Sequence, residues 1–103
     1  MTSTFPGPEQ SGLSVVIPCF NEAENIEPSY REITNALGQC SLELFYVDDG
    51  STDGTLTKIH SLAAADPRVR YVSFSRNFGF EAAFSAGYRY AAKPWILHID
   101  ADQ

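Results

Sequence analysis

The stretch LSVVIP, residues 13–18, decides the fold class of this chain. It is short, apolar and rich in β-branched side chains, which is typical of a strand buried on both faces. Such strands belong to parallel sheets whose two faces are covered by helices. Residues 13–18 therefore predict an α/β domain, in which further strands should alternate with helices.

Three further apolar runs of strand length follow: LELFYV (42–47), VRYVSF (69–74) and WILHI (95–99). The first stretch between them is predicted to be a helix with Asn25 as its N-cap. Pro28 then falls in the first turn, where a missing N–H costs nothing because those amides have no partner within the helix. Gly38 ends this helix. Its buried face consists of apolar residues at helical spacing: Ile26, Tyr30, Ile33 and Leu37.

Two more helices complete the pattern. The second begins near Asp53 or Gly54, ends before Pro67 and turns three apolar residues inward: Leu56, Ile59 and Leu62. The third covers residues 81–92, is closed by Pro94 and is expected to bury Ala83, Phe84, Gly87 and Tyr88. Alternating strands and helices predict right-handed crossovers in one sheet. The fold class expected is therefore α/β, a Rossmann-like three-layer sandwich with a mainly parallel sheet.

Length and composition fit a single domain. The chain has 103 residues, of which residues 1–12 (MTSTFPGPEQSG) are predicted to be a flexible tail and residues 13–103 the folded part. The 7 basic and 13 acidic residues give a net charge of -6. This balance argues against nucleic acid as a partner, because such binding needs a basic surface.

Cysteine usage and hydropathy indicate the compartment. Cys19 and Cys40 have neither zinc-site spacing nor a disulfide framework, so we expect two free, buried thiols in a reducing environment. No apolar run approaches the roughly 20 residues of a membrane span. Residues 1–12 lack the basic start and apolar centre of a secretory signal. These features together predict a cytoplasmic segment.

The polar clusters of the sequence all follow the predicted strands. In order along the chain they are Pro18, Asn21 and Glu22; Asp48, Asp49 and Ser51; Ser75, Arg76 and Asn77; and Asp100 and Asp102. In open α/β sheets, ligands bind outside the carboxyl ends of the strands, where the strand order reverses. The sequence therefore predicts a ligand site at this edge.

Up to six carboxylates could gather there: Glu22, Asp48, Asp49, Asp53, Asp100 and Asp102. Their repulsion must be offset by protonation, hydrogen bonds, a basic partner or a divalent cation. Arg76 supplies at most one positive charge. Mg²⁺ or Mn²⁺ suits carboxylates with open coordination positions and often completes its shell with substrate phosphates, so a metal-bound nucleotide diphosphate is a reasonable inference.

Each motif also has a plainer interpretation. DDGSTDGT (48–55) and NFG (77–79) could be ordinary turns, and Arg76 could be solvated. His98 could be a strand residue without a ligand. Cys19 is expected to pack without reacting, because no cationic partner is evident to lower its pKa.

Together the motifs carry a resemblance. SVVIPCFNEAENI, YVDDGSTDGT, SRNFGFEAAFSAGY and HIDADQ resemble, in order and spacing, the amino-terminal half of the family 2 glycosyltransferases, and the polyprenyl- and dolichyl-phosphate sugar transferases in particular. The resemblance covers residues 13–103. It implies the amino-terminal half of a GT-A fold, truncated after the D-x-D motif.

The resemblance also implies roles by position. Pro18, Phe20 and Glu22 would border the base and ribose of the nucleotide. Val47 and Asp49 would hold the base, with Asp49 accepting from a ring N–H, while Asp48 supports the turn. In the D-x-D motif, Asp100 and Ala101 would contact the nucleotide, and Asp102 together with Asp100 a divalent metal ion, the Lewis acid for a leaving nucleoside diphosphate.

Two departures from the family pattern matter. Phe80 stands where relatives often carry a basic residue after N-F-G, which puts a phosphate contact there in doubt. Relatives also continue beyond the position of Gln103 into an acceptor-binding half and often into membrane helices. We therefore expect no catalytic residue among residues 1–103, and no turnover by these residues alone.

The reaction implied is inverting, metal-dependent transfer of a sugar from a UDP- or GDP-sugar to a lipid phosphate of the polyprenyl type. Such an enzyme would act in cell-envelope glycan biosynthesis at the cytoplasmic face of the membrane, which it would contact through other regions. Two alternatives stay open: a non-catalytic nucleotide-binding remnant or signalling module, and an α/β phosphotransferase with an aspartyl nucleophile.

Overall fold

The computed structural model describes residues 12–39, 41–93 and 95–101. Strands and helices alternate along the chain as predicted. The elements are β1 (Leu13–Cys19), α2 (Ala23–Leu37), β2 (Leu42–Asp48), α3 (Thr55–Ala65), β3 (Val69–Ser73), α4 (Phe80–Tyr90) and β4 (Trp95–His98). Of the predicted tail, residues 1–11 lie outside the described part.

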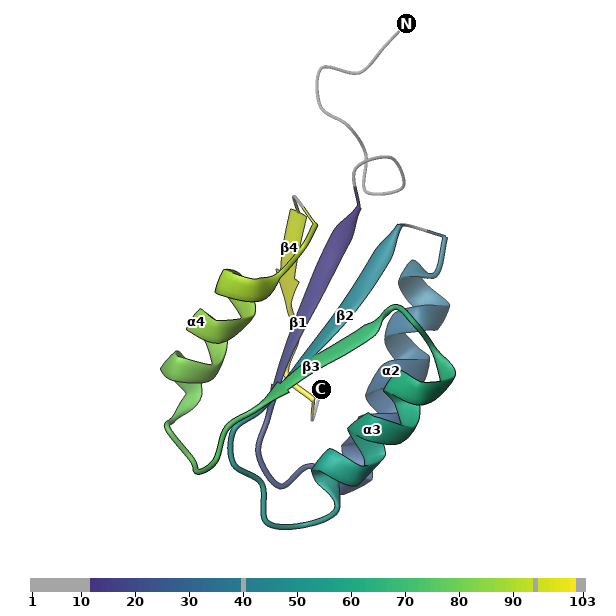
Figure 1. Cartoon of the computed structure of the whole chain (residues 1–103). Coiled ribbons are helices and arrows are strands. Elements are labelled where there is room, and N and C mark those ends of the chain that lie inside the picture. The colour runs from purple at the N-terminus through teal and green to yellow at the C-terminus, as the bar shows by residue number, and fades with distance from the viewer. Residues whose placement is uncertain (1–11, 40, 94, 102–103) are drawn as a thin grey trace, which may run out of the picture.

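The strands form one parallel sheet in the order β3-β2-β1-β4. Helices α2 and α3 cover one face, and α4 covers the other (Figure 1). This arrangement confirms the predicted α/β sandwich. The chain moves outward from β1 to β2 and β3 and then returns to the other side of β1 for β4. The strand order therefore reverses between β1 and β4, which is where such folds bind ligands.

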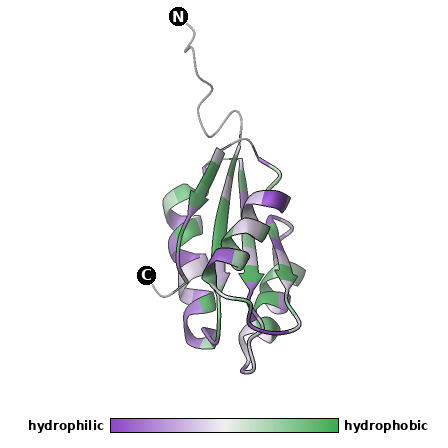
Figure 2. Cartoon of the chain, turned by 90° about the vertical axis from the view of Figure 1, so that its left-hand side faces the viewer, coloured by the Kyte–Doolittle hydropathy of each residue, from purple (hydrophilic) through white to green (hydrophobic). Residues whose placement is uncertain are grey.

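The core lies on both faces of the two central strands. On the side of α2 and α3 it is built mainly from Val15, Ile17, Ile26, Leu44, Tyr46 and Ile59. On the side of α4 it contains Val16, Phe45, Val47 and Ala83. Because neighbouring residues of β1 enter opposite cores, residues 13–18 are apolar on both faces. Figure 2 shows hydrophobic residues (green) concentrated on the strands, whereas the helices carry both hydrophobic and hydrophilic (purple) residues.

Close packing of α4 depends on a glycine. A Cβ atom placed on Gly87 would lie 2.2 Å from Cγ1 of Val16, so α4 rests on β1 with no room for a side chain there. Burial of Ala83 and Gly87 confirms the predicted inner face of this helix. The expectation for Tyr88 is wrong, since this residue is 52% exposed.

Helix α2 begins earlier than predicted. Its first residue is Ala23, so Pro28 lies in the second turn and Asn25 is not the N-cap. The helix start is held from another segment: Oγ1 of Thr55 accepts from the Glu22 amide at 2.8 Å, and Oδ2 of Asp53 accepts from the Ala23 amide at 3.4 Å. These tertiary hydrogen bonds replace the local cap that the sequence indicated. None of the described helices is both long and apolar enough to span a membrane.

Candidate functional site

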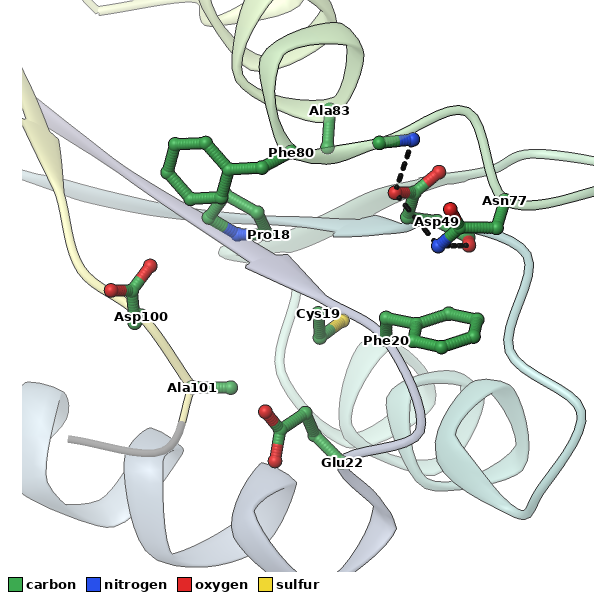
Figure 3. Close-up of a pocket in the computed structure, with 11 residues that line it drawn as sticks. Pro18, Cys19, Phe20, Glu22, Asp49, Asn77, Phe80, Ala83, Asp100 and Ala101 are labelled. Atoms are coloured by element: carbon green, nitrogen blue, oxygen red, sulfur yellow. Dashed lines mark hydrogen bonds between the residues drawn. The ribbon is translucent and has the colours of Figure 1, made fainter.

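A cleft of about 350 Å³ opens at the carboxyl ends of the strands (Figure 3). Its walls come from the ends of β1 and β2, the turn before α4, the first turn of α4 and the segment after β4. The lining residues are Pro18, Cys19, Phe20, Glu22, Asp49, Asn77, Gly79, Phe80, Ala83, Asp100 and Ala101. The parallel sheet thus brings together, at its switch point, segments that are far apart in the sequence.

All the predicted nucleotide-binding residues except Val47 line this cleft. The side chain of Val47 is 0% exposed and packs with Val16, Phe45 and Ala83 in the core beneath α4. Because Val47 lies inside β2 with its side chain pointing into that core, it cannot touch a ligand in the cleft. The role inferred for Val47 from the resemblance is therefore corrected to a packing role.

Asp48 and Asp53 stabilise turns and do not reach the cleft. Asp48 is buried, and its carboxylate accepts from the Ser51 amide at 3.2 Å and from the Ser73 hydroxyl at 3.3 Å. Its predicted turn role is confirmed. Asp53 accepts from the hydroxyl and the amide of Thr55, and these bonds lower its pKa. Asp48 and Asp53 therefore lie near the other acids at this edge of the sheet, as expected, but outside the cleft lining.

Asp49 lies at the cleft and is 4% exposed. Its Oδ1 accepts from the Phe78 amide at 2.7 Å. Its Oδ2 accepts from the Gly79 amide at 3.0 Å and from Nδ2 of Asn77 at 3.2 Å. Hydrogen bonds from one turn therefore satisfy this buried carboxylate, as the dashed lines of Figure 3 show for part of the network.

Asp100 faces the cleft from the other side of β1. Its Oδ1 lies 3.2 Å from Nε2 of His98, but the contact does not have hydrogen-bond geometry. The ring of His98 packs against Phe80 and Phe84, with centroid distances of 5.2 and 4.5 Å. His98 is thus a strand residue that also contacts a site acid and the aromatic wall.

Asp100 offers an oxygen ligand of the kind that Mg²⁺ and Mn²⁺ prefer. Within residues 12–39, 41–93 and 95–101, however, no three His, Cys, Asp or Glu side chains are placed to hold one ion. In Figure 3, Pro18 and Cys19 lie between Asp49 and the other two cleft acids, Glu22 and Asp100. The described acids alone do not make a metal centre, and the predicted ligand Asp102 lies outside the described residues.

Cys19 is buried in the floor of the cleft, and its thiol donates to the carbonyl of Val47 at 3.5 Å. Burial, followed by the nearby carboxylates of Asp48 and Glu22, raises the pKa of this thiol far above its usual range. It therefore stays protonated and packs, as the sequence suggested. Cys40 lies outside the described residues.

The turn between β3 and α4 and the first turn of α4 supply cleft residues that received no individual nucleotide-binding role from the sequence. Asn77, Gly79, Phe80 and Ala83 line the cleft, and Figure 3 shows the ring of Phe80 close to Pro18. The N-F-G motif was the available signal. Arg76 is absent from the cleft wall: its guanidinium carbon lies 4.7 Å from the centroid of the Phe78 ring. It therefore does not balance the cleft acids.

Comparisons with known proteins identify a family and relatives for this chain. The family described as Glycosyl transferase family 2 matches residues 14–103. A relative in Bacillus subtilis, "Putative glycosyltransferase CsbB", is 38% identical over 91% of this chain and 29% of its own length. The "Prophage bactoprenol glucosyl transferase homolog" of Escherichia coli is 40% identical over 87% of this chain and 30% of its own length. The chain thus spans about a third or less of these two relatives.

Solved structures share the fold. The mannosyltransferase PcManGT from Pyrobaculum calidifontis, in complex with GDP-Man and Mn²⁺, has a TM-score of 0.76 and 28% identity. It is matched over 87% of this chain and 27% of its own. TarS 1-349 of S. aureus, in complex with UDP-GlcNAc, has a TM-score of 0.69 and 25% identity over 87% of this chain and 26% of its own. Both share the fold over most of this chain.

Proposed function

The chain belongs to glycosyl transferase family 2, and from this membership we propose that it forms the nucleotide-sugar-binding half of an enzyme that glycosylates a lipid phosphate. The observation that carries the proposal is the cleft at the switch point of the sheet. Residues of four separate family motifs line it, and among them Phe20, Glu22 and Asp100 combine an aromatic surface with acceptors for hydroxyl groups.

The donor is proposed to be a UDP- or GDP-sugar. The similarity to one glycosyltransferase solved with GDP-Man and another solved with UDP-GlcNAc supports a nucleoside diphosphate donor. In the cleft, the exposed rings of Phe20 and Phe80 provide flat apolar surfaces for a base or sugar. Glu22 and Asp100 are proposed to accept hydrogen bonds from ribose hydroxyls.

The acceptor is proposed to be a polyprenyl phosphate, which the names of several bactoprenol glucosyl transferase relatives support. Such a phosphate is already ionised near neutral pH, so it needs less help from a general base than a sugar hydroxyl would. Transfer would invert the anomeric carbon, with catalysis resting on positioning and on stabilising the leaving diphosphate. We place the reaction at the cytoplasmic face of the membrane.

We propose that the enzyme uses a divalent cation, Mg²⁺ or Mn²⁺, because the similar protein PcManGT was solved in complex with Mn²⁺. When bound, it would offset the charge of the leaving diphosphate. Asp100 and Asp102 are the residues proposed to hold it. The proposed roles of the described cleft residues do not depend on this ion. Phe20 and Phe80 would orient the donor, and Glu22 would bind its hydroxyl groups.

The proposal is tested by calorimetric titration of the full-length protein with UDP-glucose, UDP-GlcNAc and GDP-mannose, with and without Mn²⁺. We expect at least one donor to bind, and Phe20→Ala to weaken its binding about tenfold through loss of an aromatic contact. A matched control is Phe78→Ala, an exposed aromatic residue outside the cleft lining. If none of the three donors binds, the proposed function is wrong.

A further inference from the structure

We propose that Asn21 is a positioning residue of the donor cleft, whose left-handed backbone holds its two neighbours, Phe20 and Glu22, in the cleft wall. Phe20 and Glu22 both line the cleft, whereas Asn21 lies outside the lining. Asn21 therefore acts on a bound nucleotide only through these neighbours. The inference rests on the proposed function, because it concerns how the donor site of that function is held in shape.

The backbone of Asn21 has a conformation that most residues avoid. Its φ is 53°, and among the described residues it is the only one besides glycines with a positive φ. This region is unfavourable for L-residues because Cβ comes too close to a carbonyl oxygen, and asparagine tolerates it better than most. The chain bends here between the end of β1 and the start of α2 at Ala23. The directions of Phe20 and Glu22 therefore depend on the conformation of the residue between them.

Two hydrogen bonds fix Asn21 to the turn after β2. The amide of Asn21 donates to Oγ of Ser51 at 2.9 Å, and its Oδ1 accepts from the Thr52 amide at 2.8 Å. These partners are 30 and 31 residues away in the chain. Asparagine suits this position because one side chain combines tolerance of the left-handed region with a hydrogen-bond acceptor.

The two neighbours of Asn21 differ in how much other support they have. The amide of Glu22 donates to Oγ1 of Thr55 at 2.8 Å, and Oε1 of Glu22 accepts from Nδ2 of Asn25 at 2.9 Å. Phe20 is 44% exposed, so packing alone does not determine where its ring lies. The direction in which the backbone presents Phe20 decides this instead. A change at Asn21 should therefore act mainly through Phe20.

A purely structural role for Asn21 would give a different result. In that case a substitution would lower the free energy of unfolding, and the molecules that stay folded would bind nucleotide as before. If Asn21 positions Phe20, a share of the folded molecules leaves the binding conformation, and the apparent affinity falls by that share. The loss then requires Phe20 to be present, so substitutions of Asn21 and Phe20 should not add.

The experiment is a calorimetric titration of the full-length protein with UDP and with GDP. Asn21→Ala removes the acceptor and disfavours the left-handed backbone. Asn21→Gly also removes the acceptor but adopts a positive φ freely. Asn21→Ala is measured again in the Phe20→Ala background. The matched control is Asn35→Ala, which changes an exposed asparagine of α2 away from the cleft lining. Urea unfolding of each variant gives its folded fraction.

We expect Asn21→Ala to weaken nucleotide binding by the folded protein about fivefold, because part of the population leaves the left-handed conformation. Asn21→Gly should weaken it less, about twofold, because glycine keeps that conformation accessible. In the Phe20→Ala background, Asn21→Ala should cost about twofold or less. Asn35→Ala should bind as the wild type does.

Three results would each overturn the inference: unchanged affinity in folded Asn21→Ala, equal losses in Asn21→Ala and Asn21→Gly, or a full fivefold loss in the Phe20→Ala background. In all three cases the wild-type protein still binds a nucleotide, so the proposed function stands. If the wild-type protein binds neither UDP nor GDP, the proposed function is wrong, and the positioning role of Asn21 is wrong with it.

Discussion

Glu43, near the amino end of β2, and Asp49, just beyond its carboxyl end, are both buried acids, and they are held differently. Glu43, near the amino end, is 5% exposed and bonds to Ser14 Oγ and Arg70 Nη1 at 2.6 Å each and to the Ala92 amide at 3.0 Å. Asp49, just beyond the carboxyl end, is 4% exposed and bonds only to neutral donors among the described residues. One acid has a cation beside it, and the other does not.

This difference distinguishes the amino end of the sheet from the carboxyl end, which holds the candidate site. At the amino end, the charge of Glu43 is neutralised by Arg70, and the network ties the segment after α4 to β1 and β2. At the carboxyl end, a second acid, Asp100, also lies on the cleft without Lys or Arg beside it in the described lining. The negative charge there has no Lys or Arg beside it among the described lining residues, whereas the charge of Glu43 is balanced by Arg70.

The largest effect that tests this comparison is expected for Glu43→Ala. Its loss leaves the Arg70 guanidinium, the Ser14 hydroxyl and the Ala92 amide without their shared acceptor. We expect the free energy of unfolding in urea to fall by about 3 kcal/mol. Nucleotide affinity under folding conditions should not change. A selective loss of nucleotide binding in this variant would contradict the division between the two ends.

The next effect is expected for Gly50→Ala at the carboxyl end. Gly50 has a φ of 74°, and a Cβ atom would collide with the backbone of Arg76 and Asn77. We expect a loss of about 2 kcal/mol in the free energy of unfolding, together with weaker nucleotide binding. Gly79→Ala is the matched stability control. Gly79 also has positive φ, at 102°, but a Cβ atom there meets nothing within 4 Å. Equal losses in the two variants would show that the contact between the turns contributes nothing.

The sequence predicts the features of this fold that depend on local patterns, and it does not predict contacts between residues that are far apart in the chain. Parallel strands place their carboxyl ends on one edge, so Glu22, Asp49 and Asp100 could be assigned to one site before any contact was known. The hydrogen bonds that Asp49 accepts within the protein could not be predicted, because its partner Phe78 is 29 residues away. The start of α2 was predicted incorrectly for the same reason: Asp53 and Thr55 hold it from 30 and 33 residues away. Local sequence patterns indicate the helices and strands and the edge of the sheet where polar residues gather. They do not indicate which hydrogen-bond donor meets which acceptor.

A smaller effect is expected for Arg70→Met, which removes only the cation. Arg70 has a side chain that is 48% exposed, and its guanidinium carbon lies 5.4 Å from the centroid of the Phe45 ring. Solvent screens this ion pair, and methionine keeps the contact with the ring, so we expect a loss of about 1 kcal/mol in urea. Raising the salt concentration should reduce the difference from the wild type. A loss as large as that of Glu43→Ala would mean that the pair is not screened.

The smallest effect is the response of the amino end to acid. Burial alone would raise the pKa of Glu43, but hydrogen bonds from Ala92, Ser14 and Arg70 outweigh it and hold the pKa below its ordinary value of 4.5. Because the folded protein binds this proton less readily than the unfolded chain, the contribution is complete above pH 4.5 and is lost as pH falls through the lowered pKa. Protonated Glu43 keeps its volume and can still accept hydrogen bonds, so the loss should be smaller than in Glu43→Ala.

The measurement must separate Glu43 from other acids. Asp66 and Asp53 also have lowered pKa values, and their contributions to stability respond to acid in the same direction. The informative quantity is therefore the difference in the free energy of unfolding between the wild type and Glu43→Gln. Urea unfolding from pH 6 to pH 3 should show this difference shrinking toward low pH, and a difference that stays constant would place the stabilising effect of Glu43 in its shape alone.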